Sequence, residues 1–172
     1  MKSIRIREAK PDDAGAIAGV HVASWRTTYP GIVPDAYLAG IDVREREGRW
    51  RSILDSASQT FTLVAETEVG ELVGFAGGGR ERSGDKVYRG ELQALYLLES
   101  YQRRGIGQQL FEAVTARLDE AGMVSMMVWV ASENAPARRF YEKLGVELVC
   151  DQDIAIGGES LSEVAYGWRD VS

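Results

Sequence analysis

Short stretches of alternating or continuous apolar residues predict β-strands along much of the chain. The predicted strands cover residues 3–7, 61–66, 72–77, 87–98, 126–131, 146–151 and 162–168. The second and third of these are expected to pair as a hairpin across Val69-Gly70. We expect Gly77-Gly78-Gly79 to end the third strand and Gly157-Gly158 to form the turn before the last one.

Helical periodicity fills the intervals between these strands. Pro11-Asp12-Asp13 is expected to open a helix, whose apolar face carries Ala14, Ile17, Ala18 and either His21 or Val22. Helical stretches follow at residues 35–38 and 43–54, a long helix is predicted at residues 105–121, and a shorter one at residues 134–144. The stripe of the first long helix is Ile106, Leu110, Ala113 or Val114, and Leu118.

Length and composition predict one globular domain over residues 1–172, in which 45% of the residues are hydrophobic and 27% are charged. No apolar run approaches the about 20 residues that a membrane span requires, and the first residues lack the apolar core of a signal peptide. Cys150 is the only cysteine, which excludes an internal disulfide and suits a reducing cytosol. We therefore expect a cytoplasmic protein without a membrane partner.

Charge and residue counts exclude several classes of function. A net charge of −6 argues against a nucleic-acid partner and is compatible with attracting a cationic amine. One histidine and one cysteine leave no zinc-ligand set, so no metal is expected. A Ser-His-Asp triad would have to use His21, yet no Gly-x-Ser-x-Gly elbow is present. His21 is interpreted as a packing or substrate-side residue.

The segment from Tyr101 to Phe111 places a glycine turn between a predicted strand and a predicted helix. This layout directs the free N–H groups and the positive end of the helix dipole at a phosphate. Gly105 and Gly107 remove side chains that would keep a pyrophosphate from these amides. A Walker loop is excluded because Gln108-Gln109 follows Gly107, and the dinucleotide fingerprint lacks its third glycine. An ordinary strand-to-helix turn is the alternative reading of two glycines alone.

A second motif lies at residues 133–145, where Asn134 is a suitable N-cap, Pro136 fits the first turn and Gly145 ends the helix. The two motifs are Gln102-x-x-Gly-x-Gly and Asn134-x-x-Ala-x-x-Phe-Tyr-x-Lys-x-Gly. As a pair, they resemble the signature motifs of the GNAT superfamily of acyl-CoA N-acyltransferases. The resemblance is strong from Glu71 to Gly145 and rests on element order elsewhere.

The resemblance implies a single-domain α/β fold with a mixed, mostly antiparallel central sheet flanked by helices on both faces. It also implies an enzyme that transfers the acetyl group of acetyl-CoA to a primary amine of a small molecule, by direct attack on the thioester. A peptide or protein N-terminal acetyltransferase and a non-catalytic acyl-CoA-binding module are the alternatives. Homodimers are common in this fold, although the sequence carries no specific signal for one.

The resemblance further implies which residues hold the cofactor. A bulge in the strand before the glycine turn would free the main chain of Leu95, Tyr96 and Leu97 to pair with the pantetheine arm. The pyrophosphate would be wrapped by Arg103, Arg104, Gly105, Ile106, Gly107 and Gln108. Asn134 would contact the cofactor arm as well as cap its helix. The side chains of Leu95 and Leu97 can also pack in the core, and this role is compatible with cofactor binding by their main chain.

For catalysis, the resemblance assigns Tyr141 as the general acid that protonates the departing thiolate. Glu91 matches a catalytic glutamate of some members, and its role as base or as a substrate-orienting carboxylate stays open. Other members place a base on the next strand, where this chain has Trp129, which cannot serve. Trp25, Thr28 and Tyr29 are expected to line the acceptor site, with core packing as the alternative for these residues and above all for Trp25.

Overall fold

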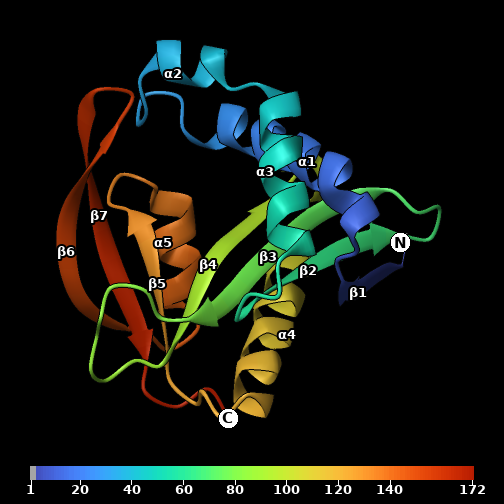
Figure 1. Cartoon of the computed structure of the whole chain (residues 1–172). Coiled ribbons are helices and arrows are strands. Elements are labelled where there is room, and N and C mark those ends of the chain that lie inside the picture. The colour runs from blue at the N-terminus through green and yellow to red at the C-terminus, as the bar shows by residue number, and fades with distance from the viewer. Residues whose placement is uncertain (1–2) are drawn as a thin grey trace.

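The computed structural model describes residues 3–172 and contains a seven-stranded sheet in the order β1-β2-β3-β4-β5-β7-β6 (Figure 1). The strands are β1 (Ile4–Glu8), β2 (Thr60–Thr67), β3 (Leu72–Arg80), β4 (Gly90–Leu97), β5 (Met126–Ala131), β6 (Glu147–Ile156) and β7 (Glu159–Trp168). Among the strand pairings of residues 3–172, only that of β4 with β5 is parallel. The predicted fold class, a mixed and mostly antiparallel sheet, is confirmed.

Helices cover both faces of this sheet. They are α1 (Ala14–Thr28), α2 (Asp35–Gly40), α3 (Val43–Asp55), α4 (Ile106–Glu120) and α5 (Ala135–Glu142). Ile17 of α1 and Trp50 of α3 pack with Phe75 of β3 on one face. Leu110 of α4 and Tyr141 of α5 belong to the core on the other face (Figure 1). Within residues 3–172, no helix is both long and apolar enough to cross a membrane.

Strands β4 and β5 part after a short parallel contact. Their register joins Gly90 to Met126 and ends with Leu92 opposite Val128. From there β5 continues along β7, whereas β4 continues along β3. A bulge lies at the same point, because Gly77 faces Ala94 and Gly78 faces Leu92, which leaves Gln93 as an extra residue. The bulge that the family resemblance implied is therefore present in β4.

Several predicted strand boundaries are wrong. Gly77-Gly78-Gly79 does not end a strand, because β3 runs through it to Arg80. These glycines allow a close approach of neighbours: a Cβ on Gly78 would lie 2.7 Å from the Phe61 ring, and one on Gly79 would lie 2.8 Å from the carbonyl oxygen of Gln59. The sheet needs glycine at these positions because neighbouring atoms pack where a side chain would be, and the strand continues through them.

The strand predicted at residues 87–98 begins only at Gly90, and residues 81–89 form a loop. The loop is closed by two carboxylates, since Glu81 accepts hydrogen bonds from the N–H groups of Gly84 and Asp85, both at 2.9 Å. Asp85 in turn accepts from the N–H of Val87 at 2.7 Å. These side-chain bonds replace the backbone ladder that a longer strand would need. The β6–β7 hairpin also differs from the prediction, because both of its strands extend further toward the glycine turn.

His21 packs inside the helical layer above β3 and β4. Its Nδ1 atom accepts a hydrogen bond of 3.1 Å from the indole N–H of Trp50. Its ring stacks on Tyr96 with 5.6 Å between the centroids and lies 5.7 Å from the ring of Phe75. Burial, with a smaller effect from the charge of Arg46, lowers the pKa of His21 to about 4. The packing interpretation of His21 therefore agrees with its surroundings.

The pKa of His21 predicts a pH-dependent part of the folding stability. The folded-state pKa is below the unfolded value of about 6.5, so the unfolded chain binds more protons between these two values. This contribution is present above pH 6.5 and is lost as the pH falls toward 4. His21→Asn can still accept a hydrogen bond from Trp50 but does not titrate. In this variant we expect the decrease in the free energy of unfolding between pH 6.5 and pH 4 to be smaller than in the wild type, by at most about 3 kcal/mol. Urea unfolding of both proteins across this pH range tests it, and parallel pH curves would contradict it.

Candidate active site

A groove of about 710 Å³ opens where β4 and β5 separate. Its walls come from the end of α1, the second half of β4, the glycine turn and α5. Of the predicted cofactor residues, those that line it are Leu95, Tyr96, Leu97, Arg103, Gly105, Gly107, Gln108 and Asn134. The volume lies within the usual range for cofactor sites.

The glycine turn presents free backbone amides to this groove. Gly105 is the residue before α4 and has a φ of 81°, and no side chain caps the helix there. A Cβ on Gly105 would meet no atom within 4 Å, so the space in front of it is open. Arg103 also has a positive φ, of 58°, a strained conformation for a residue with a side chain. Uncapped amides and the positive end of the α4 dipole make this turn suitable for a phosphate.

Two residues predicted with this turn lie outside the groove lining. The guanidinium of Arg104 sits over the ring of Tyr101 at 5.3 Å from its centroid. The side chain of Ile106 is buried in the core, which leaves its backbone as the only part that can face a ligand.

The β4 wall of the groove offers main-chain groups. Leu95, Tyr96 and Leu97 pair with β3 on one side, and on the other side β5 has already separated. The carbonyl of Leu97 accepts a hydrogen bond of 3.1 Å from the Ser24 hydroxyl, which fixes this end of the strand. The backbone toward the groove is thus free to bind an extended arm that carries amides.

Helix α5 supplies Asn134 and Tyr141 to the opposite wall. Asn134 is 7% exposed, and its side-chain oxygen caps the helix by accepting from the N–H of Ala137 at 3.3 Å. Tyr141 is 5% exposed. Burial, together with nearby Tyr29, raises the pKa of the Tyr141 hydroxyl, which therefore stays protonated at neutral pH and can donate a proton.

A second pocket, of about 450 Å³, lies on the other side of Tyr96, which lines both cavities. Predicted acceptor residues Trp25 and Tyr29 line this pocket, whereas Thr28 lines the larger groove. The hydroxyls of Tyr29 and Tyr96 are hydrogen-bonded at 3.0 Å. Burial raises the pKa of both, so two neutral phenols stand where the cavities meet.

Glu91 lines the smaller pocket but already has a partner. Its side chain is 5% exposed and both carboxylate oxygens accept from the guanidinium of Arg82, at 2.8 Å from NH2 and 3.0 Å from Nε. The backbone N–H of Arg82 adds a third bond of 3.2 Å. This hydrogen bonding raises the pKa of Arg82. A buried carboxylate in such a bidentate ion pair is held in a fixed orientation.

Sequence reasoning missed several residues of the smaller pocket, including Arg82, Gln93 and Glu163. Arg82 lies in an irregular loop, where no periodic pattern could have placed it. For Glu163 a signal existed, because it alternates on β7 with Leu161, which lines the same pocket. Trp129 of β5 also lines this pocket, and its indole ring cannot act as a base there. The residues that the structure describes contain no group of side chains able to hold a metal ion.

Comparisons with known proteins agree with this geometry. The sequence matches the family model for the acetyltransferase (GNAT) family over residues 15–146. It is 42% identical to the uncharacterized N-acetyltransferase YuaI of Bacillus subtilis, over 98% of this chain and 95% of that protein. It is 33% identical to a probable N-acetyltransferase of Mycobacterium tuberculosis, over 82% of this chain and 78% of that one.

Solved structures share the fold. The PaiA N-acetyltransferase of Thermoplasma acidophilum, in complex with coenzyme A, aligns with a TM-score of 0.73 and 24% identity over 94% of this chain and 98% of its own. A putative acetyltransferase of Salmonella typhimurium, yncA, with its cofactor acetyl-CoA, aligns with a TM-score of 0.70 and 20% identity over 99% of this chain and 95% of its own. The chain therefore belongs to the GNAT family and is an N-acetyltransferase.

Proposed function

We propose that the protein transfers an acetyl group from acetyl-CoA to the primary amine of a small molecule. The observation that carries this proposal is the meeting of two cavities at Tyr96, one lined by free backbone and the glycine turn and the other by aromatic and charged side chains. Free amides at the N-terminus of α4 fit a pyrophosphate, and the free edge of β4 fits the amide-bearing arm of coenzyme A. Related folds bound to coenzyme A and to acetyl-CoA support this choice of donor.

The shape of the acceptor pocket favours a small molecule over a peptide. At the tip of the β6–β7 hairpin, Gly157 packs on Tyr37 of α2, where a Cβ on this glycine would lie 2.9 Å from that of Tyr37. Ile156 packs against the cluster that contains Val33 and Leu38. The contact between the hairpin tip and α2 thus limits the pocket on one side, and about 450 Å³ is left for the acceptor.

In the proposed reaction, acetyl-CoA supplies a thioester, which an amine can attack directly. The amine has to reach the meeting point of the cavities in its neutral form. Deprotonation of a lysine-like amine at pH 7 costs about 4–5 kcal/mol. The new bond joins the amine nitrogen to the acetyl carbon as the carbon–sulfur bond breaks. Tyr141 donates its hydroxyl proton to sulfur, the proton lost by nitrogen passes to water, and solvent reprotonates Tyr141.

Release of the coenzyme A thiol, measured across a panel of amines and peptides with an amine-free baseline, tests the proposed function. We expect acetyl-CoA to be consumed with one class of small amine and not with peptides. Activity only with peptide N-termini would replace the small-molecule proposal. Tight acetyl-CoA binding in calorimetry without transfer to any acceptor would favour a binding module instead.

Tyr141→Phe tests the general acid. The change removes the only proton that this side chain can donate and keeps its packing against Phe140 and Trp168. We expect kcat to fall by about 100-fold or more, while the affinity for acetyl-CoA, measured by calorimetry, changes little. Tyr88→Phe, which removes the hydroxyl of a buried tyrosine that lines neither cavity, is the matched control. Unchanged turnover in Tyr141→Phe would remove this residue from the mechanism.

For Glu91 we propose an orienting role, because Arg82 occupies both of its oxygens. Glu91→Gln should raise the acceptor KM and leave the acidic limb of the pH–rate profile in place. Arg82→Gln should also raise the acceptor KM. The acceptor KM of the double variant should be no higher than that of either single variant, because each of the three proteins lacks the same ion pair. Loss of the acidic limb in Glu91→Gln would instead establish Glu91 as the base.

A further inference from the structure

The walls of the acceptor pocket carry three charged side chains, Arg82, Glu91 and Glu163. The first two neutralise one another in the bidentate ion pair. Glu163 has no cationic partner within 4.0 Å among the ion pairs of residues 3–172. The pocket therefore has a net negative charge that resides on Glu163.

The position of Glu163 is fixed by its strand and by one hydrogen bond. On β7 it lies between Gln152 of β6 and Ala131 of β5, and all three residues line the pocket. The side-chain amide of Gln152 donates to one of its oxygens, Oε2, at 3.0 Å. In the described part of the chain the other oxygen, Oε1, accepts no side-chain hydrogen bond. A half-buried carboxylate with a free oxygen is suited to receive an ammonium group.

Glu163 also lies close to the place where the two cavities meet. Its charge acts on the hydroxyl of Tyr29, where it adds to the effect of burial in raising the pKa of that group. Tyr29 is hydrogen-bonded to Tyr96, which lines both cavities. The carboxylate is thus on the acceptor side of the transfer point.

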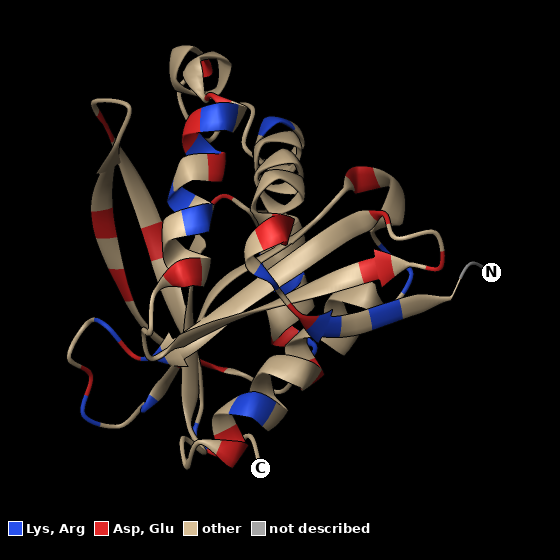
Figure 2. Ribbon diagram, turned by 45° about the vertical axis from the view of Figure 1, so that its right-hand side comes forward, with Lys and Arg blue, Asp and Glu red and all other residues tan. Residues whose placement is uncertain are grey.

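The surrounding hairpin strengthens the negative potential. Residues 147–168 contain no Lys or Arg, and Figure 2 shows acidic positions and no basic ones along this hairpin. Its acidic residues are Glu147, Asp151, Asp153, Glu159 and Glu163. Fields of one sign at the mouth of a cavity raise the local concentration of the opposite ion.

We propose that Glu163 binds the ammonium group of the acceptor, so that the acceptor class is a cationic amine held between this carboxylate and the aromatic walls formed by Trp25, Tyr29 and Trp129. This inference rests on the proposed function and assigns the ammonium group to Glu163 of β7, whereas Glu91 of β4 stays paired with Arg82 and shapes the pocket beside it. After the amine loses its proton to water, the neutral nitrogen is free to leave Glu163 for the transfer point.

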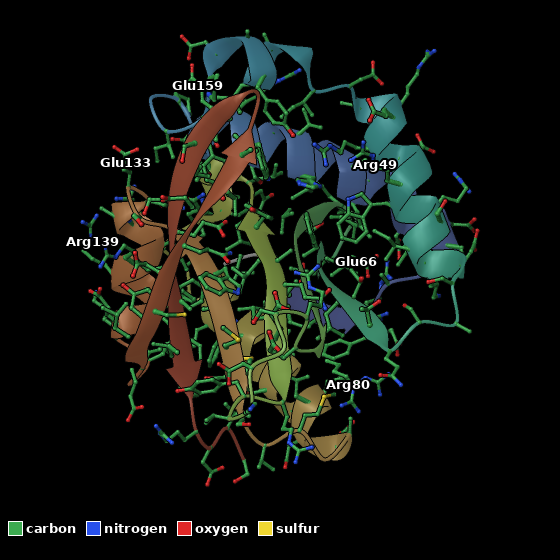
Figure 3. The ribbon with its side chains drawn as sticks, turned by 60° about the vertical axis from the view of Figure 1, so that its left-hand side comes forward. Arg49, Glu66, Arg80, Glu133, Arg139 and Glu159 are labelled. Carbon is green, nitrogen blue, oxygen red and sulfur yellow. The ribbon has the colours of Figure 1, made fainter. Side chains whose placement is uncertain are left out.

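Binding of butylammonium, followed by the intrinsic tryptophan fluorescence to which Trp25 and Trp129 of the pocket contribute, tests the proposal without requiring acetyl transfer. The ion is fully charged at pH 7, and n-butanol at the same ionic strength controls for apolar contact. Glu163→Gln keeps the bond from Gln152 and removes only the charge, so we expect the dissociation constant to rise at least about tenfold. Glu159→Gln is the matched control, because Glu159 lies on the same strand but is exposed at the hairpin tip (Figure 3).

Three results would overturn the inference: wild-type protein that binds butylammonium no better than butanol, Glu163→Gln that binds like wild type, or equal losses in both variants. The proposed function fails separately, if no amine releases thiol from acetyl-CoA while butylammonium still binds. If transfer occurs, Glu163→Gln should raise the acceptor KM at least about tenfold and leave the acetyl-CoA KM unchanged.

Discussion

The separation of β4 from β5 is the constraint on which both cavities depend. The two strands share only the register from Gly90 to Leu92, and the bulge at Gln93 turns the rest of β4 away. Beyond that point the backbone groups of β4 that face away from β3 have no partner strand, and they line the groove instead. The same separation gives room on the opposite side for a pocket, so one irregularity in one strand creates both halves of the site.

The two halves were not equally predictable from the sequence. The cofactor side relies on backbone geometry, and backbone geometry has local signals: Gly105 and Gly107 in a turn, and Asn134 at a helix start. The acceptor side relies on side chains that only the sheet brings together. Arg82 reaches Glu91 from an irregular loop, and Glu163 comes from the last strand, so no local pattern joins them.

The fold shows the same division. Helix α4 and strand β5 lie where their periodicity predicts them, because one packed face per element produces a regular pattern. The glycine run in β3 misled sequence reasoning, since glycine marks turns as well as close contacts between strands. Only the partner tells the two apart, and the partner of Gly78 is the ring of Phe61 across the pairing with β2. The extra length of β6 depends likewise on its pairing with β7.

The meeting point of the cavities holds hydroxyls that are neutral. Burial raises the pKa values of Tyr29, Tyr96 and Tyr141, so each can donate a proton and none can accept one from an ammonium ion at neutral pH. An acid can therefore act there, but a base cannot. In the proposed reaction the acceptor's proton leaves on the other side, through the open pocket, where Glu163 provides negative charge and water has access. On this reasoning, proton donation belongs to the cofactor side and cation binding to the acceptor side, with Tyr96 between them.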